Sequence, residues 1–256
     1  MKISAVIITY NEERNISRCL NSIKKVADEI IVVDSFSNDN TILICESFNA
    51  EIYQRKFDGY GDQKNYGIEH AAHNYILSLD ADEALSHQLQ LSILELRQQA
   101  TNKAAYQFNR RNHIDKKWVN YGVWYPDCKM RLWDKNKGQW NLAFVHEKVD
   151  LQPGTKPMLL KGDLFHFTAA TFYQLRATNE KYATLGALQL FKNGKKYSFI
   201  DTSLRPLFAF FKAYFIKLGF LDGWMGIKLA HENARYTHLK YFRLKSIIKE
   251  AKNVNA

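Results

Sequence analysis

The chain has 256 residues, of which 46% are hydrophobic and 24% are charged, and its 12 glycines and 4 prolines exclude a collagen-like or low-complexity protein. The formal net charge of +10 is unevenly spread, because residues 1–151 carry 19 Lys and Arg against 20 Asp and Glu, whereas residues 152–256 carry 17 against 6. This asymmetry indicates a near-neutral half and a basic half, and the basic half either faces an anionic partner or is simply a basic solvated surface.

The three cysteines, Cys19, Cys45 and Cys128, lie far apart and form no CxxC pair. They offer no disulfide framework, which favours a reducing compartment. The first apolar run stops at Asn11, whereas a signal peptide would continue with apolar residues and end in small ones. We therefore expect a first β-strand there and a cytoplasmic protein.

Apolar runs and helical patterns alternate over the first hundred residues. Buried strands are expected at SAVIITY, EIIVVD, EIYQR and NYILSLD, which begin at residues 4, 29, 51 and 74. Helices are expected between the strands, one of them near 62–73 and one over 86–99. The candidate N-caps are Asn11, with Glu12 and Glu13 in the first turn, then Ser37 or Asn38, and Ser86.

This alternation predicts an α/β fold with a mostly parallel central sheet and helices on both faces. The short, aromatic-rich runs from about 103 to 168 predict a mixed or antiparallel extension of the same sheet. Residues 169–252 are predicted to be mostly helical.

Polar segments follow three of the expected strands, as TYNEE, VDSFSND and LDADE. Ligands of such sheets bind beyond the carboxyl ends of the strands, so these segments are expected to converge on one crevice. Residues i and i+2 of a strand point the same way, so Asp80 and Asp82 can face one ligand. Paired carboxylates suit Mg²⁺ or Mn²⁺. The alternative is that Asp82 and Glu83 only begin the next helix.

Motifs for several other chemistries are missing, since the chain has no GxGxxG, GxxxxGK[ST], HExxH or GxSxG. Four segments instead resemble, in order and spacing, glycosyltransferase family 2 with the GT-A fold: MKISAVIITYNEERNISRCLNSI, IIVVDSFSNDNT, GYGDQKNYGIEHA and YILSLDADE. The segments YPDCKMRLW, FVHEKV, LFHFT and GFLDGWMGIKLA resemble bacterial lipopolysaccharide inner-core glucosyltransferases. The sequence departs from that subgroup at Phe36 and Asn38, where Gly and Thr are more usual.

The resemblance implies a GT-A catalytic domain over 1–168 and a basic helical C-terminal region over 169–256. Within the first, residues 1–100 form the nucleotide-sugar-binding half and residues 101–168 the acceptor half. Processive synthases of the wider family carry QxxRW, which this chain lacks, so transfer of a single sugar is favoured.

The resemblance also implies a UDP-sugar donor, UDP-glucose first, and a divalent metal, Mg²⁺ or Mn²⁺. A late histidine often joins the metal in GT-A enzymes, although a lone histidine on such a strand is more often a core residue. The residues implied are Thr9, Tyr10 and Glu12 for the nucleoside, Asp34 for the uracil ring, Gln63, Lys64 and Asn65 for the nucleotide, Asp80 for the ribose or a metal-bound water, Asp82 for the metal, and His166 as a further metal ligand.

An acceptor hydroxyl is a poor nucleophile, so a carboxylate is expected to take its proton. Glu147, in Val145-His146-Glu147, is our first candidate because the segment resembles the subgroup's acceptor block, and Asp127 is the second. Either could instead be a surface ion-pair residue. A single displacement would invert the anomeric carbon. Trp124 and Trp140 could stack on sugars, although tryptophans in such places are more often core residues.

An apolar stripe at helical spacing runs through the basic C-terminal region, formed by Leu204, Leu207, Phe208, Phe211, Phe215 and Leu218. Because Arg205, Lys212 and Lys217 interrupt it, a transmembrane helix is not expected. The stripe either packs on the catalytic domain or lies in a membrane interface, with its cations meeting anionic lipid of the inner membrane.

The expected acceptor is the lipopolysaccharide inner core, with a polyprenyl phosphate or another glycan as the alternative. From a different class, the rival is a non-catalytic basic module that binds membrane or nucleic acid. Nucleic acid is disfavoured because the expected crevice is acidic and would repel a phosphate backbone.

Overall fold

The computed structural model describes residues 1–99, 103–143 and 147–254. The chain divides into two compact units. We call residues 1–111 together with 127–167 the sheet unit, and residues 112–126 together with 168–256 the helical unit. The segment 112–126 therefore belongs with the C-terminal helices although it lies between two sheet segments in the sequence.

The main sheet has nine strands in the described residues, in the order β3-β2-β1-β4-β8-β6-β11-β5, with β7 paired to β6. A separate two-stranded sheet pairs β9 with β10. The strands are β1 (Ile3–Thr9), β2 (Glu29–Asp34), β3 (Glu51–Gln54), β4 (Tyr75–Asp80), β5 (Glu83–Leu85), β6 (Ala105–Ile114), β7 (Lys117–Trp118), β8 (Asp127–Asp134), β9 (Gly138–Trp140), β10 (Val149–Leu151) and β11 (Met158–Ala169).

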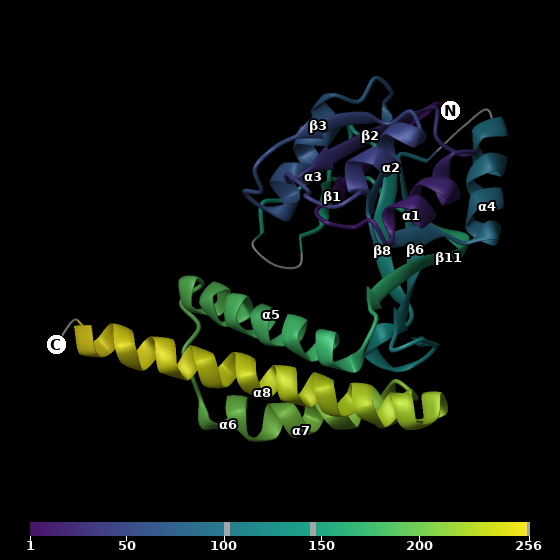
Figure 1. Ribbon diagram of the computed structural model, residues 1–256. Helices are drawn as coiled ribbons and strands as arrows, with labels where there is room; N and C mark the ends of the chain where they lie inside the picture. Colours follow the sequence, from purple (N-terminus) through teal and green to yellow (C-terminus); the bar gives the residue numbers. More distant parts are fainter. Residues whose placement is uncertain (100–102, 144–146, 255–256) are drawn as a thin grey trace. The chain divides into compact units, whose positions relative to one another are not determined.

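The parallel part of the sheet consists of β3, β2, β1 and β4. Every residue of β1 is buried, as expected for a parallel strand whose two faces are covered by helices. Successive side chains of β1 point to opposite faces of the sheet. Ile7 packs in the cluster that contains Leu20 of α1 (Ile16–Ile23), whereas Val6 packs in the cluster that takes in Ile68 of α3 (Tyr60–Glu69). Figure 1 shows these helices around the sheet.

The second half of the sheet is antiparallel: β8 pairs antiparallel with both β4 and β6, and β11 pairs antiparallel with β5. The predicted α/β class, with a parallel core, an antiparallel extension and C-terminal helices, is therefore confirmed. Helix α4 (His87–Gln98) begins as predicted at Ser86, whose hydroxyl accepts a hydrogen bond from the Leu89 N–H.

Two predicted helix starts were wrong. Helix α1 begins at Ile16 after Asn15, so Glu12 and Glu13 precede the helix. The reason is that Asn11 takes a left-handed backbone (φ 53°), and its side-chain oxygen accepts the Asn38 N–H. Helix α2 (Thr41–Ser47) begins after Asn40, because the side chains of Ser37 and Asp39 are used to bind the preceding loop. Helix α3 also ends at Glu69, earlier than expected.

The alternative in which Asp82 and Glu83 begin the next helix was also wrong. Glu83 is the first residue of the short strand β5, and its side chain is fully buried. Strand β4 ends at Asp80, so Asp82 lies in the turn between β4 and β5 and not on an extended strand.

The helical unit contains α5 (Phe172–Lys192), α6 (Phe199–Thr202), α7 (Leu204–Phe211), a π-helical turn η2 (Lys212–Ile216), a 3-10 turn η3 (Gly219–Asp222) and α8 (Gly223–Val254). Helix α5 starts with a capping box between Thr171 and Gln174. It is held to α8 by the buried Glu232, which pairs with Arg176 and Arg235. None of the helices in the described part of the chain combines the length and apolar character needed to cross a bilayer.

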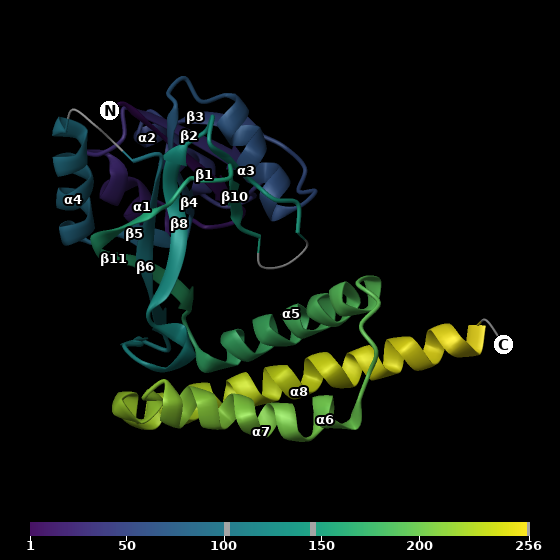
Figure 2. The ribbon, with the colours of Figure 1, turned by 180° about the vertical axis from the view of Figure 1, so that it is seen from behind.

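Gly162 in β11 gives a test of this packing, with Gly154 as its control. Both glycines have a positive φ, 97° and 84°, but a Cβ on Gly162 would lie 2.4 Å from the Leu89 backbone nitrogen, whereas one on Gly154 meets nothing. Figure 2 shows α4, which carries Leu89, beside β5 and β11. We expect Gly154→Ala to cost about 1 kcal/mol of stability, and Gly162→Ala about 1–3 kcal/mol more. Urea unfolding measures both, and equal losses would contradict the packing described.

Candidate active site

The ends of three parallel strands lie side by side in the sheet unit. The pairing register places Thr9 at the end of β1 opposite Asp34 at the end of β2, and Ile8 opposite Asp80 at the end of β4. Since these are carboxyl ends, the polar segments that follow them are brought to one edge, as the sequence predicted.

The loop after β2 is held by its own side chains. Asp34 is fully buried, and its carboxylate accepts hydrogen bonds from the Ser37 N–H, the Ser37 hydroxyl and the Gln54 amide. Phe36 takes a left-handed backbone with φ of 63°. Glycine, which is more usual at this position in the resembled subgroup, would reach that conformation without the cost of about 1–2 kcal/mol that Phe36 bears.

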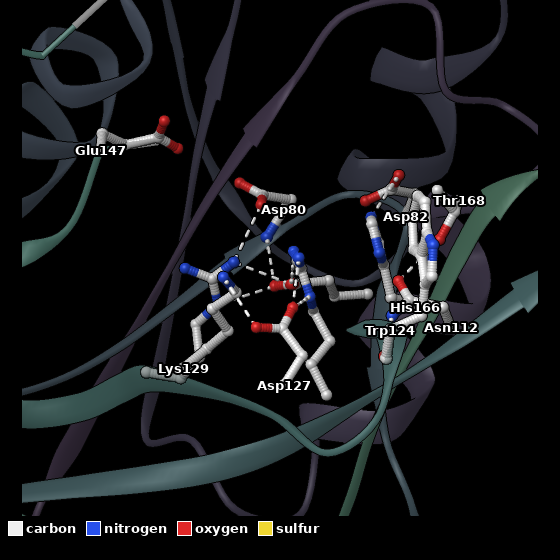
Figure 3. A network of polar contacts seen from close by, with 12 residues as sticks. Asp80, Asp82, Asn112, Trp124, Asp127, Lys129, Glu147, His166 and Thr168 are labelled. Carbon is white, nitrogen blue, oxygen red and sulfur yellow. Dashed lines mark hydrogen bonds and ion pairs between the residues drawn. The ribbon is translucent and has the colours of Figure 1, made fainter. Parts of the chain in front are cut away.

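An unbroken series of ion pairs crosses the site, and we call it the charge ladder. It alternates acid and base in the order Glu147, Lys64, Asp80, Arg131, Glu83, Arg110, Asp127 and Lys129. The successive nitrogen–oxygen distances are 2.9, 3.0, 3.0, 2.8, 3.6, 2.7 and 3.0 Å. Figure 3 shows part of it around Asp80 and Asp127.

The centre of the charge ladder is withdrawn from water. Lys64 and Arg131 are only 1% and 4% exposed, and Glu83 is fully buried. Glu83 makes a bidentate pair with Arg131 and also accepts the Asp80 N–H. Buried charges persist only when they are paired and hydrogen-bonded, so each member holds its neighbours in place.

The charge ladder fixes the ionisation of two carboxyl groups. Burial alone would raise the pKa of Asp80, but the charges of Lys64 and Arg131 outweigh it and hold that pKa below its ordinary value. Burial likewise opposes ionisation of Asp127, and Arg110 with Lys129 lowers its pKa overall. Both aspartates are therefore ionised at neutral pH.

A second, smaller group lies beside the charge ladder. Asp82 faces His166 of β11, with 3.2 Å between its Oδ2 and the histidine Nε2 (Figure 3). Burial raises the pKa of Glu12, and the negative charges of Asp82 and Asp39 raise it further. Asp80 and Asp82 thus have different partners in this structure: Asp80 contacts the two cations, and Asp82 contacts His166.

The candidate nucleotide residues differ in how free their polar atoms are. Among the described residues, Thr9 Oγ1 and Gln63 Oε1 are buried without a hydrogen-bond partner. The side-chain nitrogen and oxygen of Asn65 are both hydrogen-bonded, because the nitrogen donates to the Trp140 carbonyl and the oxygen accepts the Trp140 N–H. Tyr10 is exposed.

The two tryptophans considered as sugar platforms are not placed alike. Trp140 is buried, donates to the Ser78 hydroxyl, and has the Lys64 ammonium 4.3 Å from its ring centroid. It is therefore a core residue, and its suggested sugar stacking was wrong. Trp124 belongs to the helical unit, where its carbonyl accepts from Asn112. Residues 144–146, which include the Val145-His146 part of the predicted acceptor segment, lie outside the described residues.

The family model described as "Glycosyl transferase family 2" matches residues 4–150. This chain belongs to that family. A relative described as an uncharacterized glycosyltransferase of Rickettsia bellii (strain RML369-C) is 34% identical over 235 residues, which are 88% of this chain and 80% of the relative. The lipopolysaccharide core biosynthesis glycosyltransferase LpsC of Rhizobium meliloti (strain 1021) is 28% identical over 225 residues, 84% of this chain and 81% of that protein.

Among solved structures, the crystal structure of S. aureus TarS 1-349 is 15% identical and has a TM-score of 0.45, with 98% of this chain and 92% of that chain covered. The family-2 membership predicted from the motifs is confirmed by the family match and by the relatives. The activity of the chain is therefore glycosyl transfer.

The sequence patterns did not indicate four members of the charge ladder in this family-2 chain: Arg131, Glu83, Arg110 and Lys129. A signal for two of them was present. Asp127, Lys129 and Arg131 occupy alternate positions in the sequence of β8, and a charge at every second position of a partly buried strand is unusual. Glu83 was considered only in the alternative in which Asp82 and Glu83 begin the next helix, so no partner was assigned to it.

Arg131 gives a test of the charge ladder. Arg131→Met would leave Glu83 buried without its main partner, and we expect a loss of about 3–5 kcal/mol in the free energy of unfolding. The matched control is Lys148→Met, whose pair with Asp150 is exposed and 3.9 Å long. The control should cost about 0–1 kcal/mol. Chemical denaturation compares the two, and similar values for both would contradict the structural role of Arg131.

Asp127 gives a pH test. It faces Arg110 from β6 and Lys129 from its own strand, and its pKa lies below the ordinary 3.8. Its contribution to stability is therefore complete above that value and is lost as the pH falls through the lowered pKa. Asp127→Asn should lower stability at neutral pH and flatten its decline below about pH 4. Asp150→Asn, at an exposed strand position, is the control. An unchanged slope in Asp127→Asn would refute the assignment.

Proposed function

We propose that this family-2 glycosyltransferase moves one hexose to the inner core of lipopolysaccharide with inversion of the anomeric carbon. Our first choice of donor is UDP-glucose, from which glucose would be transferred. The motif resemblance supports this, as does the relative LpsC, which is described as acting in lipopolysaccharide core biosynthesis. The observation that carries the proposal is the buried Lys64 ammonium, 3.0 Å from Asp80 and 2.9 Å from Glu147. The ammonium connects Asp80, at the end of β4 where the donor is proposed to bind, with Glu147, the first candidate for the base.

The nucleotide would be received where buried polar atoms lack partners. Leaving such atoms unsatisfied is costly, and a bound ligand relieves the cost. Thr9 Oγ1 can donate to a uracil carbonyl, and Gln63 Oε1 can accept from a ring N–H. Asp34 remains a candidate for the ring N–H, although in this structure it binds its own loop. Tyr10 and Glu12 lie on the segment directly after Thr9.

A divalent metal, Mg²⁺ or Mn²⁺, is part of the proposal, with Asp82, His166 and Asp80 as the residues that would hold it. Among the described residues no three His, Cys, Asp or Glu side chains are already grouped to chelate an ion. Mg²⁺ fits such a site, because proteins bind it through one or two carboxylates together with substrate phosphates. When bound, the metal neutralises charge on the leaving diphosphate.

Glu147 is the better candidate for the base. Glu147 is paired with one cation, Lys64, whereas two cations lie beside Asp127 and lower its pKa further from the range near the working pH in which a general base works best. In the proposed step, the acceptor hydroxyl oxygen bonds to the anomeric carbon while the bond from that carbon to the phosphate oxygen breaks. The hydroxyl proton passes to Glu147, and UDP leaves with the bonding electron pair.

The function is tested by incubating the full chain with UDP-glucose or UDP-galactose and either a truncated lipopolysaccharide core or a polyprenyl phosphate, with Mn²⁺ or with a chelator. We expect transfer from UDP-glucose to the core, dependent on the metal. A β-linkage in the product checks inversion. Transfer only to polyprenyl phosphate, or undiminished transfer with the chelator, would overturn the corresponding part of the proposal.

Two substitutions test the assigned roles. Glu147→Gln should lower kcat by about 10²–10⁴-fold because the proton acceptor is lost, while UDP still raises the melting temperature in the presence of Mn²⁺. Asp82→Ala should lose activity together with the metal-dependent part of that thermal shift, and should keep its fold by circular dichroism. Asp150→Asn is the control for removing one carboxylate. Wild-type turnover in Glu147→Gln would exclude it as the base.

A further inference from the structure

The helical unit exposes an unusual number of large apolar side chains within one short stretch of chain. We call this set the apolar face. Its members lie on α6, α7, η2, η3 and the start of α8, with one residue between η2 and η3, and each is at least 43% exposed: Phe199, Ile200, Leu204, Leu207, Phe208, Phe211, Phe215, Ile216, Leu218, Phe220, Leu221 and Trp224. Soluble proteins rarely gather so many apolar groups at one surface without a partner for it.

The same stretch turns its small residues inward. Pro206, Ala213 and Gly219 are buried between the exposed apolar positions. Their packing leaves no room for larger groups, since a Cβ on Gly219 would lie 2.5 Å from the Ala213 carbonyl oxygen, and one on Gly226 would lie 1.8 Å from the Gly219 carbonyl oxygen. The large side chains therefore cannot be exchanged with the small ones, and their outward placement is built into the backbone.

The charges within the apolar face are cationic. Lys212 and Lys217 lie in the stretch and are exposed. Its two acids are used internally, because Asp201 is buried and pairs with Arg205, while Asp222 accepts the backbone N–H groups of Asn120 and Tyr121. The helical unit as a whole has 17 Lys and Arg against 6 Asp and Glu.

We propose that the apolar face docks on an anionic lipid bilayer, lying in the interface without crossing it. Three observations specify this occupant. Apolar side chains with lysines among them match an interfacial element, whose cations meet the headgroups while the apolar groups enter the acyl boundary. No helix in the described residues is suited to span. Both acids of the stretch are already bound within the chain, so its exposed lysines are left to meet an anionic surface. The proposal is independent of the donor and acceptor assigned above.

The test is flotation of the full chain with phosphatidylcholine vesicles that contain or lack phosphatidylglycerol. We expect binding to the anionic vesicles that weakens with added salt. Lys212→Glu with Lys217→Glu should weaken it by at least about tenfold, since each lysine near such a surface contributes about a factor of five. Phe208→Ser with Phe211→Ser should abolish it. The matched controls in the sheet unit are Lys25→Glu with Lys148→Glu, and Leu43→Ser with Leu159→Ser, which should bind as wild type does.

Circular dichroism, and UDP release from UDP-glucose during transfer to a soluble acceptor, check that each variant folds, and the charge pair remains a valid test if the serine pair does not. Absence of vesicle binding by the wild type would overturn the proposal, because the apolar face would then be covered by protein. A concentration-dependent dimer that Phe208→Ser with Phe211→Ser converts to monomer would overturn it in favour of a second copy. Equal weakening in the control variants would likewise reject it.

Discussion

The position of one ammonium group controls the site. Lys64 is buried against the Trp140 ring, and its charge is balanced by Asp80 on one side and Glu147 on the other. An unpaired charge there would be strongly unfavourable, so the amine and both carboxylates specify one another's positions. Because Asp80 also pairs with Arg131, the constraint continues through Glu83 and Arg110 to Asp127. Four acids and four bases thus form one neutral system.

The sheet explains how residues far apart in the sequence reach that system. Parallel strands bring Thr9, Asp34 and Asp80 to one edge through backbone pairing alone. The antiparallel strands then supply three of the four cations, since β8 carries Arg131 and Lys129, and β6 carries Arg110. A one-residue slip of β8 would turn its charged positions to the opposite face, so the register of this strand is as important to the site as the residue types.

Much of the fold followed from the sequence, because long apolar runs, strand-end acids and the Ser86 cap are local signals. The charge ladder did not, because ion pairs between distant residues depend on strand order, which periodicity does not reveal. The helix starts near Asn11 and Ser37 failed for a related reason. Each of those side chains accepts a hydrogen bond from a backbone N–H of the other loop, about 26 residues away in the sequence. From the sequence alone, a side chain that binds another loop in this way cannot be distinguished from one that caps a helix. The stripe of the C-terminal region was recognised as helical, but its solvent exposure depends on the small residues that face inward.

Strand β11 has a consequence for where a minimal enzyme can end. The family match covers residues 4–150, whereas β11 begins at Met158. Yet β11 pairs with β5, places His166 beside Asp82, and donates the Phe167 N–H to the Asp82 carbonyl. A fragment cut at the family boundary would retain the aspartates but lose the strand that orients one of them. The family match and the folded sheet unit therefore end at different residues in this protein.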